Sequence, residues 1–323
     1  MANYMLENFL YSVNVILPIF ILVSLGVILK KVRVIPENFS DAVDKLIFKL
    51  ALPSMLFLEV SGAELSEALN VRLALFAACA ITVMFLTVLG IVCLLVRDNE
   101  KRGAMIQGIC RSNFAILGMP LIDNMFGAAG VQEAALIMPI TILLYNTYSV
   151  IVLSIFAPKE KQLPLGQTVR KILRNIVTNP LIIGVVLGLP FLFFNLDLPL
   201  VASKSLKYLS NLVTPAALIS LGSTVKLKSF QGRVRLAVLS ACSKTIFVPA
   251  VMVTVAALLG FRGSALGTLL ILFGAPTAVS SYIMAKNMGS DHELAGQILL
   301  LTTLMCLFTI FIFIFILKSL ALI

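Results

Sequence analysis

Two segments of this sequence combine helix breakers with polar side chains, and both lie within long apolar runs. The first reads Arg-Ser-Asn-Phe-Ala-Ile-Leu-Gly-Met-Pro over residues 111–120, and the second reads Gly-Ala-Pro-Thr-Ala-Val-Ser-Ser over 274–281. Proline removes a backbone donor and glycine relaxes the backbone, so each segment is expected to interrupt a helix or, more simply, to kink it for packing. Amides freed by an interruption present positive dipole ends that suit a carboxylate. The predicted anion site includes Asn113, Gly118, Pro120, Pro276, Thr277 and Ser280.

Four further polar residues lie inside apolar runs and could serve the same site. Arg111 adjoins the first interruption; a charge at such depth is rare, and it acts either as a substrate counter-ion or gating charge or as a structural partner of a carbonyl or carboxylate. Lys244 could bind an anion, or could hold the loose carbonyls of an interrupted helix in place of a sodium ion. Tyr145 and Asn146 belong to a polar group in which Asn146 either lines the site or bonds two helices together.

The elements that position these residues are predicted to be membrane-spanning helices. Hydrophobic residues make up 60% of the 323 residues and charged residues 12%, whereas soluble domains are about half apolar and a quarter charged. The mean hydropathy is +1.05, and the apolar runs are continuous, without the alternation of a barrel strand. We therefore predict an all-α membrane protein of ten transmembrane helices. The expected spans are roughly 9–29, 39–60, 70–96, 103–126, 131–156, 175–194, 203–223, 234–259, 264–287 and 293–318.

An internal repeat divides the spans into two halves. The segment 46–53 is echoed by 208–215, and each ends in proline. An Arg-Gly pair opens both the fourth and the ninth span, so the two interrupted segments fall at corresponding positions. Because each half has an odd number of spans, the halves should be inverted relative to each other, as in many secondary carriers. The predicted division is a first five-helix repeat at 1–156, a cytoplasmic linker at 157–169 and a second repeat at 170–323.

The basic residues predict the orientation in the membrane. Most Lys and Arg residues fall in the loops after the odd-numbered spans, which are therefore expected to be cytoplasmic. This places both termini outside the cell, with the chain in the cell membrane. The formal charge of +10 does not indicate nucleic-acid binding, because the basic residues are scattered through short loops.

Enzyme chemistry is not indicated by the residues. His292 is the single histidine, and the neighbours Ser243 and Lys244 point about 100° apart on a helix, so they cannot act as nucleophile and base. No cysteine spacing suits zinc, and we expect neither a metal nor a cofactor. No carboxylate lies deep in any predicted span except Glu59 and Asp123, near span ends, so proton coupling through a buried acid is not indicated.

The interrupted segments resemble those of the auxin efflux carrier family, bacterial and plant membrane carriers related to the plant PIN proteins. Residues 113–127 carry the pattern Asn-x4-Gly-x-Pro-Leu followed by Met-Phe-Gly, similar to the family's fourth span, and 276–286 is similar to its ninth. The resemblance covers essentially the whole chain. It implies a support domain, a transport domain and a substrate site where the two broken helices cross. Ser112 stands where plant members have a proline, so the first break is expected to be milder or nearer Gly118 and Pro120.

The cationic interior favours an anionic substrate. The resemblance implies small organic acids, namely dicarboxylates such as malate or malonate in bacterial members and indole-type monocarboxylates in plant members. Few aromatic residues accompany the expected site, which favours the small acid. The predicted function is elevator-type secondary transport of a small organic anion. The alternatives are a membrane-embedded sensor on a carrier fold and a carrier of an auxin-like aromatic acid.

Coupling and assembly stay open at this stage. A symporter driven by H⁺ or Na⁺, a uniporter driven by the membrane potential and an anion exchanger all fit the residues. A monoanion leaving a negative-inside cell gains about 2.3 kcal/mol per 100 mV, so export could proceed without a coupled ion. The resemblance also implies a homodimer.

Overall fold

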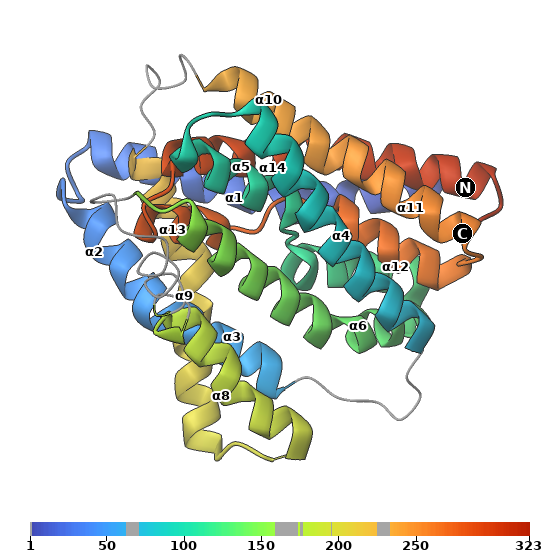
Figure 1. Cartoon of the computed structure of the whole chain (residues 1–323), viewed down its shortest axis with the longest axis horizontal. Helices are drawn as coiled ribbons and strands as arrows, with labels where there is room; N and C mark the ends of the chain where they lie inside the picture. Colours follow the sequence, from blue (N-terminus) through green and yellow to red (C-terminus); the bar gives the residue numbers. More distant parts are fainter. Residues whose placement is uncertain (1, 63–70, 159–173, 175–176, 195, 225–232) are drawn as a thin grey trace.

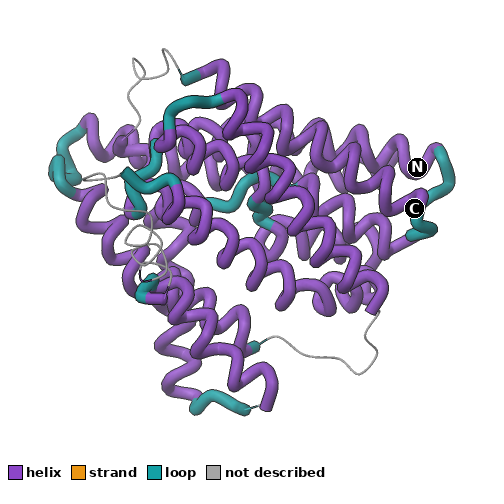
Figure 2. Tube along the Cα trace, viewed as in Figure 1, coloured by secondary structure: helices purple, strands orange, loops and turns teal. Residues whose placement is uncertain are grey.

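The chain folds into helices joined by short loops (Figure 1). The computed structural model describes residues 2–62, 71–158, 174, 177–194, 196–224 and 233–323, and in these ranges it contains no strand (Figure 2). The predicted linker at 157–169 lies largely outside the described residues. The two ends of the chain lie near each other at one edge of the molecule (Figure 1).

The helices agree with the predicted spans to within a few residues at most ends. The first half contains α1 (Ala2–Lys31), α2 (Phe39–Leu46), the π-helical turn η1 (Ile47–Ala51), α3 (Leu52–Ser61), α4 (Val71–Leu95), α5 (Asn99–Cys110), the π-helical turn η2 (Phe114–Gly118) and α6 (Met119–Ile155). The second half contains α8 (Pro180–Phe194), α9 (Leu200–Thr224), α10 (Val234–Cys242), the π-helical turn η4 (Ser243–Phe247), α11 (Val248–Leu258), α12 (Gly263–Gly274), α13 (Ser280–Asn287) and α14 (His292–Ser319). The all-helical fold class is confirmed.

Few of the helices are long enough to cross a membrane by themselves. Within the described ranges, three helices are each long and apolar enough to cross a membrane, at Val71–Leu95, Gly130–Ile155 and Val234–Leu258. The bent pair His292–Cys306 and Phe308–Ser319 would form a fourth. Interrupted spans consist of two short helices, and such helices do not reach the roughly 20 residues that one crossing needs. The full count of ten therefore stays a prediction.

Two groups of helices can be distinguished in the fold. Helices α1, α2, α3, α8 and α9 form the smaller group, in which α1 packs on α9 and α3 packs on α8. Helices α4, α5, α6, α10, α11, α12 and α14 form the larger group, and α13 lies against both (Figure 1). One core of buried apolar side chains lies within the larger group, and a second joins the smaller group to α6, α13 and α14. The outer faces of α4, α11 and α14 expose many large apolar side chains, as lipid-facing helices do.

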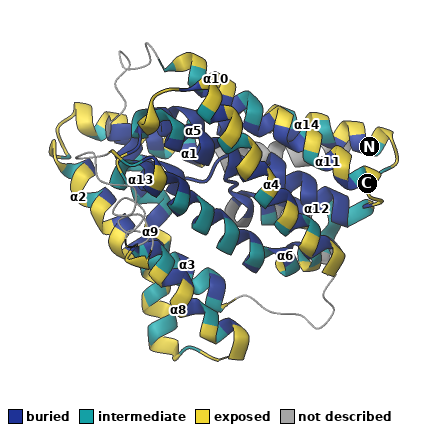
Figure 3. Ribbon diagram, in the orientation of Figure 1, coloured by how far each residue is buried: buried dark blue, intermediate teal, exposed yellow. Residues whose placement is uncertain are grey.

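Both predicted interruptions are present at the centre of the larger group. Helix α5 ends at Cys110, and Arg111 adopts an extended backbone with ψ of 140° before helical structure resumes at Phe114. Helix α12 ends at Gly274, and α13 begins at Ser280. Figure 3 shows that α5, α12 and α13 are buried in the middle of the molecule.

The first break lies at residues 111–113, and the expectation that it is shifted toward Gly118 and Pro120 is wrong. Gly118 has helical backbone angles, with φ of −75° and ψ of −47°, and Pro120 stands in the first turn of α6, where proline needs no donor. A second break falls at Gly127, whose φ of 59° suits glycine and separates the two parts of α6. It coincides with the predicted loop between the fourth and fifth spans.

Candidate functional site

The two interrupted segments cross and are hydrogen-bonded to each other. The backbone N–H of Asn113 donates to the carbonyl of Pro276 at 2.8 Å. The hydroxyl of Thr277 donates to the carbonyl of Gly108, which has lost its helical partner because α5 ends two residues later. Each break therefore supplies a partner for a backbone group that the other break leaves free. That the two segments are the broken fourth and ninth membrane spans stays a prediction.

Side chains from neighbouring helices satisfy other carbonyls at the crossing. The amide of Gln107 donates to the carbonyl of Ser281 at 2.7 Å. The ammonium of Lys244, fully buried at η4, donates to the carbonyl of Phe273 at 3.0 Å, one residue before α12 ends. The geometry of Lys244 fits the second of its two predicted roles, since it holds a loose carbonyl of a broken helix.

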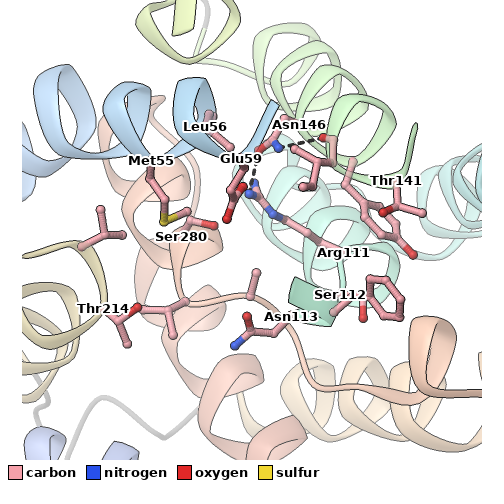
Figure 4. A pocket seen from close by; sticks show the side chains of 16 residues that line it. Met55, Leu56, Glu59, Arg111, Ser112, Asn113, Thr141, Asn146, Thr214 and Ser280 are labelled. Atoms are coloured by element: carbon pink, nitrogen blue, oxygen red, sulfur yellow. Dashed lines mark hydrogen bonds between the residues drawn. The ribbon is translucent and has the colours of Figure 1, made fainter. Parts of the chain in front are cut away.

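A cavity lies beside the crossing, between the smaller and the larger group of helices (Figure 4). It encloses about 570 Å³ of empty space, its opening to solvent included. Helices α3 and α9 form one wall, and the two breaks together with α6 form the other. The lining residues are Met55, Leu56, Glu59, Arg111, Ser112, Asn113, Phe114, Thr141, Ile142, Tyr145, Asn146, Val213, Thr214, Ala278, Val279 and Ser280.

Arg111 places a buried positive charge at the edge of this cavity. Its side chain is 4% exposed, and Nη2 donates to Oδ1 of Asn146 at 2.7 Å. The other end of the Asn146 amide donates to the carbonyl of Ile142 at 2.8 Å, which fixes the orientation of the oxygen toward Arg111. Nη1 of Arg111 donates to the sulfur of Met284. Both acceptors are neutral, and a guanidinium has five N–H donors, so Arg111 keeps donors for a carboxylate.

Glu59 also lines the cavity, with its carboxylate facing the guanidinium of Arg111 (Figure 4). The two side chains attract each other electrostatically, and Lys207 of α9 attracts Glu59 as well. The sequence placed Glu59 near the end of a span and gave it no part in the site. That position does not exclude it, because α3 ends at Ser61 and the cavity extends to this last turn.

Two hydroxyl groups at the cavity lack hydrogen-bond partners among the described residues. They belong to Ser112 and Tyr145, and both oxygens are buried. Buried polar atoms are nearly always paired, so an orphaned hydroxyl beside a cavity indicates a partner that comes from a ligand or water. Together with the free donors of Arg111, these groups give the cavity a polar lining suited to an oxygen-rich anion.

The structure brings together half of the residues predicted for the site. Arg111, Asn113, Tyr145, Asn146 and Ser280 line the cavity. Gly118, Pro276, Thr277 and Lys244 do not line it; Gly118 faces Ile271 of α12, whereas Pro276, Thr277 and Lys244 bond at the crossing. The side chain of Pro120 lies outside the described part of the structure. The polar residues that sequence reasoning missed are Glu59, Ser112, Thr141 and Thr214.

The signals for two missed residues were weak but present in the sequence. Thr214 immediately precedes Pro215, the proline that ends the second copy of the repeat, and this position in the repeat is the signal that could have identified it. Thr141 lies four residues before Tyr145 and five before Asn146, within about one and a half helical turns.

Comparison with known proteins decides the class. A family described as membrane transport protein matches residues 11–314. The chain belongs to this family. The predicted resemblance to the auxin efflux carriers is thereby confirmed, and the protein is a membrane transporter and not an enzyme.

Relatives over nearly the full length agree with this class. An uncharacterized transporter of Methanocaldococcus jannaschii is 25% identical over 304 residues, which cover 92% of this chain and 96% of the relative. A protein of Rhizobium meliloti named "Putative malonate transporter" is 24% identical over 309 residues, covering 95% of this chain and 96% of that protein.

Proposed function

We propose that this transporter carries a small dicarboxylate of the malonate type across the cell membrane, binding it in the cavity beside the crossing. The observation that carries the proposal is the guanidinium of Arg111, which is buried at the cavity wall and has N–H groups beyond those bonded to Asn146 and Met284. A planar guanidinium binds a carboxylate through two parallel hydrogen bonds. A buried cation whose bonded acceptors are neutral favours an anion over a neutral substrate.

The layout of the polar groups favours two carboxylates over one. Arg111 and Asn146 lie on one side of the cavity, and Asn113 and Thr214 lie on another (Figure 4). A short diacid can place one carboxylate at Arg111 and the other near the amide of Asn113. The name of the Rhizobium meliloti relative supports malonate as the first substrate to test. The lining contains only Phe114 and Tyr145 as aromatic residues, which favours a small acid over an indole-type acid.

Transport would occur by movement of the larger helix group relative to the smaller one. The cavity lies between the two groups, so sliding one past the other would expose it to either side of the membrane. The break residues would move with the larger group, while α3 and α9 would stay with the smaller group. The homodimer implied by the family resemblance would be formed by the stationary group and stays a prediction.

Close helix contacts support the proposed inverted repeat. A Cβ atom on Gly26 of α1 would lie 2.2 Å from the carbonyl oxygen of Ile219 and 3.1 Å from Cα of Gly222, both in α9. Gly188 of α8 faces Phe57 and Val60 of α3 in the same way, with its Cβ 3.0 Å from the Phe57 oxygen. Adding 162 to the numbers 26, 57 and 60 gives 188, 219 and 222, so both contacts follow one offset. The same offset joins the prolines of the repeat, at positions 53 and 215.

The ends of the chain support the proposed orientation in part. They lie at the same edge of the molecule, which an even number of spans requires (Figure 1). We propose that this edge faces the outside of the cell, because the loops after the odd-numbered predicted spans carry most of the basic residues and would lie on the cytoplasmic side. Labelling of single cysteines near the two ends in intact cells would test this orientation.

The proposed function is tested by uptake of radiolabelled malonate into proteoliposomes. We expect saturable uptake that is lost in Arg111→Gln and reduced in Asn113→Ala. Arg97→Gln removes an exposed arginine outside the cavity and serves as the matched control, with uptake unchanged. Malate and an indole acid are the comparators for substrate class.

Each other outcome has a definite meaning. Uptake that survives in Arg111→Gln would refute the site. Tight malonate binding to the wild-type protein without uptake would favour a sensor on a carrier fold. Preferential uptake of the indole acid would favour the auxin-like alternative.

A further inference from the structure

We propose that Glu59 couples transport to protons by competing with the substrate carboxylate for Arg111. The substrate binds when the Glu59 carboxyl group is protonated, and this group ionises and attracts Arg111 once the substrate has left the cavity. The inference rests on the proposed function, because it assigns the coupling ion of the same cavity. It makes the transporter a symporter of an organic anion and H⁺.

The geometry places the two charges where they can exchange partners. Glu59 belongs to α3 in the smaller helix group, whereas Arg111 belongs to the break after α5 in the larger group. Their side chains face each other across the cavity, and the acceptors bonded to Arg111, in Asn146 and Met284, are neutral (Figure 4). A carboxylate that enters the cavity therefore meets Arg111 with Glu59 as its direct competitor.

None of the other charged or titratable groups near Glu59 in the described structure is placed to bind the coupled proton in its stead. Lys207 on α9 is exposed and attracts Glu59, and Lys49 on η1 is also exposed. Helix α8, which packs on α3, carries no titratable residue. On α6, Tyr145 lines the cavity but is not an acid of comparable strength, and Glu133 faces Ser264 of α12 instead. Among the lining residues, Glu59 is the single carboxylate.

Charge balance gives the direction of coupling. A buried guanidinium in a membrane protein is costly unless an opposite charge compensates it. In the loaded state the substrate carboxylate supplies that charge, so a second, ionised carboxylate at Glu59 would repel the substrate and must take up a proton. In the empty state Glu59 supplies the charge and has released its proton to water. Because Glu59 stays with the smaller group, it takes its proton from the side on which the substrate enters and releases it to the side on which the substrate leaves, so one proton crosses with each substrate.

Proton uptake on binding is the most direct test. The heat of malonate binding is measured in detergent by calorimetry in two buffers of different ionisation enthalpy, at a pH where malonate is fully ionised. We expect about one proton taken up per malonate in the wild-type protein and about none in Glu59→Gln, because glutamine is a permanent neutral mimic of the protonated acid. Asp123→Asn, which removes an exposed carboxylate outside the cavity, is the control and should retain proton uptake.

Flux in proteoliposomes gives the second readout. With the membrane potential clamped, an inward proton gradient should accelerate malonate uptake by the wild-type protein and have no effect on Glu59→Gln. This variant should still exchange malonate across the membrane. Glu59→Asp keeps an ionisable carboxyl group and should keep the gradient dependence, which guards against a general folding defect in the glutamine variant.

The outcomes separate this inference from the proposed function. The role of Glu59 would be overturned if malonate uptake by the wild-type protein did not depend on the proton gradient, or if malonate bound without proton uptake. Either result would leave the carrier assignment intact. Gradient-driven uptake that persists in Glu59→Gln would also overturn it. A wild-type protein that neither binds nor transports malonate would overturn the proposed function first, and the coupling scheme with it.

Discussion

The substitution Thr277→Val tests whether the two breaks stabilise each other through hydrogen bonds. Thr277 is fully buried, and its hydroxyl donates to the carbonyl of Gly108, which has no donor from its own helix because α5 ends at Cys110. Valine has nearly the same shape but no donor, so the variant leaves this carbonyl unpaired inside the protein. An unpaired buried backbone group costs about 1–3 kcal/mol.

The matched control is Thr303→Val in α14. Thr303 is also buried, and its hydroxyl donates to the carbonyl of Leu299 at 2.7 Å, four residues earlier within the segment His292–Cys306 that precedes the bend. That carbonyl keeps its helical N–H partner when the hydroxyl is removed. The control variant should therefore lose well under the 1–3 kcal/mol expected at the crossing.

Thermal unfolding of the purified protein in detergent measures both variants. A change of 1 kcal/mol shifts Tm by about 2–4 °C in proteins of 150–250 residues, so a loss of about 1–3 kcal/mol in Thr277→Val should lower Tm by roughly 2–12 °C. Thr277→Ser restores the hydroxyl and should recover most of the loss. Equal Tm values for Thr277→Val and Thr303→Val would show that the crossing does not depend on this bond and would refute the reasoning.

Three further predictions concern residues outside the cavity. Lys244→Met should change the Kd for malonate by less than about twofold, because this lysine bonds a carbonyl of α12 and does not line the site; direct binding measures it. Gly26→Ala should sharply lower the yield of monodisperse protein in size-exclusion chromatography, because the added methyl group meets the backbone of α9 at 2.2 Å, whereas Gly90→Ala meets nothing within 4 Å. Lys101 holds the pKa of Asp98 below its ordinary value of 3.8, so the cap that Asp98 forms on α5 contributes fully above that pH and is lost as the pH falls further. Thermal unfolding should therefore show Asp98→Ala about 0.5–2 kcal/mol less stable near neutral pH, with the difference vanishing in acid.

Hydropathy and helix breakers account for the parts of the fold that the sequence predicted. Long apolar runs predict helices because lipid offers no partner for an unpaired backbone group, and the described helices match the predicted ranges closely. The break at 275–279 followed from its proline and glycine. The break at 111–113 lies within the interruption predicted for 111–120, and only the alternative that shifted it toward Gly118 and Pro120 is wrong.

Proline is not required at the first break because a tertiary contact supports it. The extended segment at Arg111 is stabilised by the bond from Asn113 to Pro276, which lies 163 positions later in the chain. No local pattern around Ser112 contains this partner. The proline rule therefore predicted where a helix could break, and the crossing chain decided where it did.

By itself, the sequence determined the class of the protein, the positions of its helices and the polar residues inside apolar runs that were candidates for a functional role, Arg111 among them. The tertiary structure alone decided which of those residues share a cavity. It placed Glu59 and Thr214 opposite Arg111 and left Lys244 at a carbonyl outside the site. The physical reason is that a pattern along one helix records depth and amphipathicity, whereas a cavity depends on the rotation and contact of several helices from distant parts of the chain.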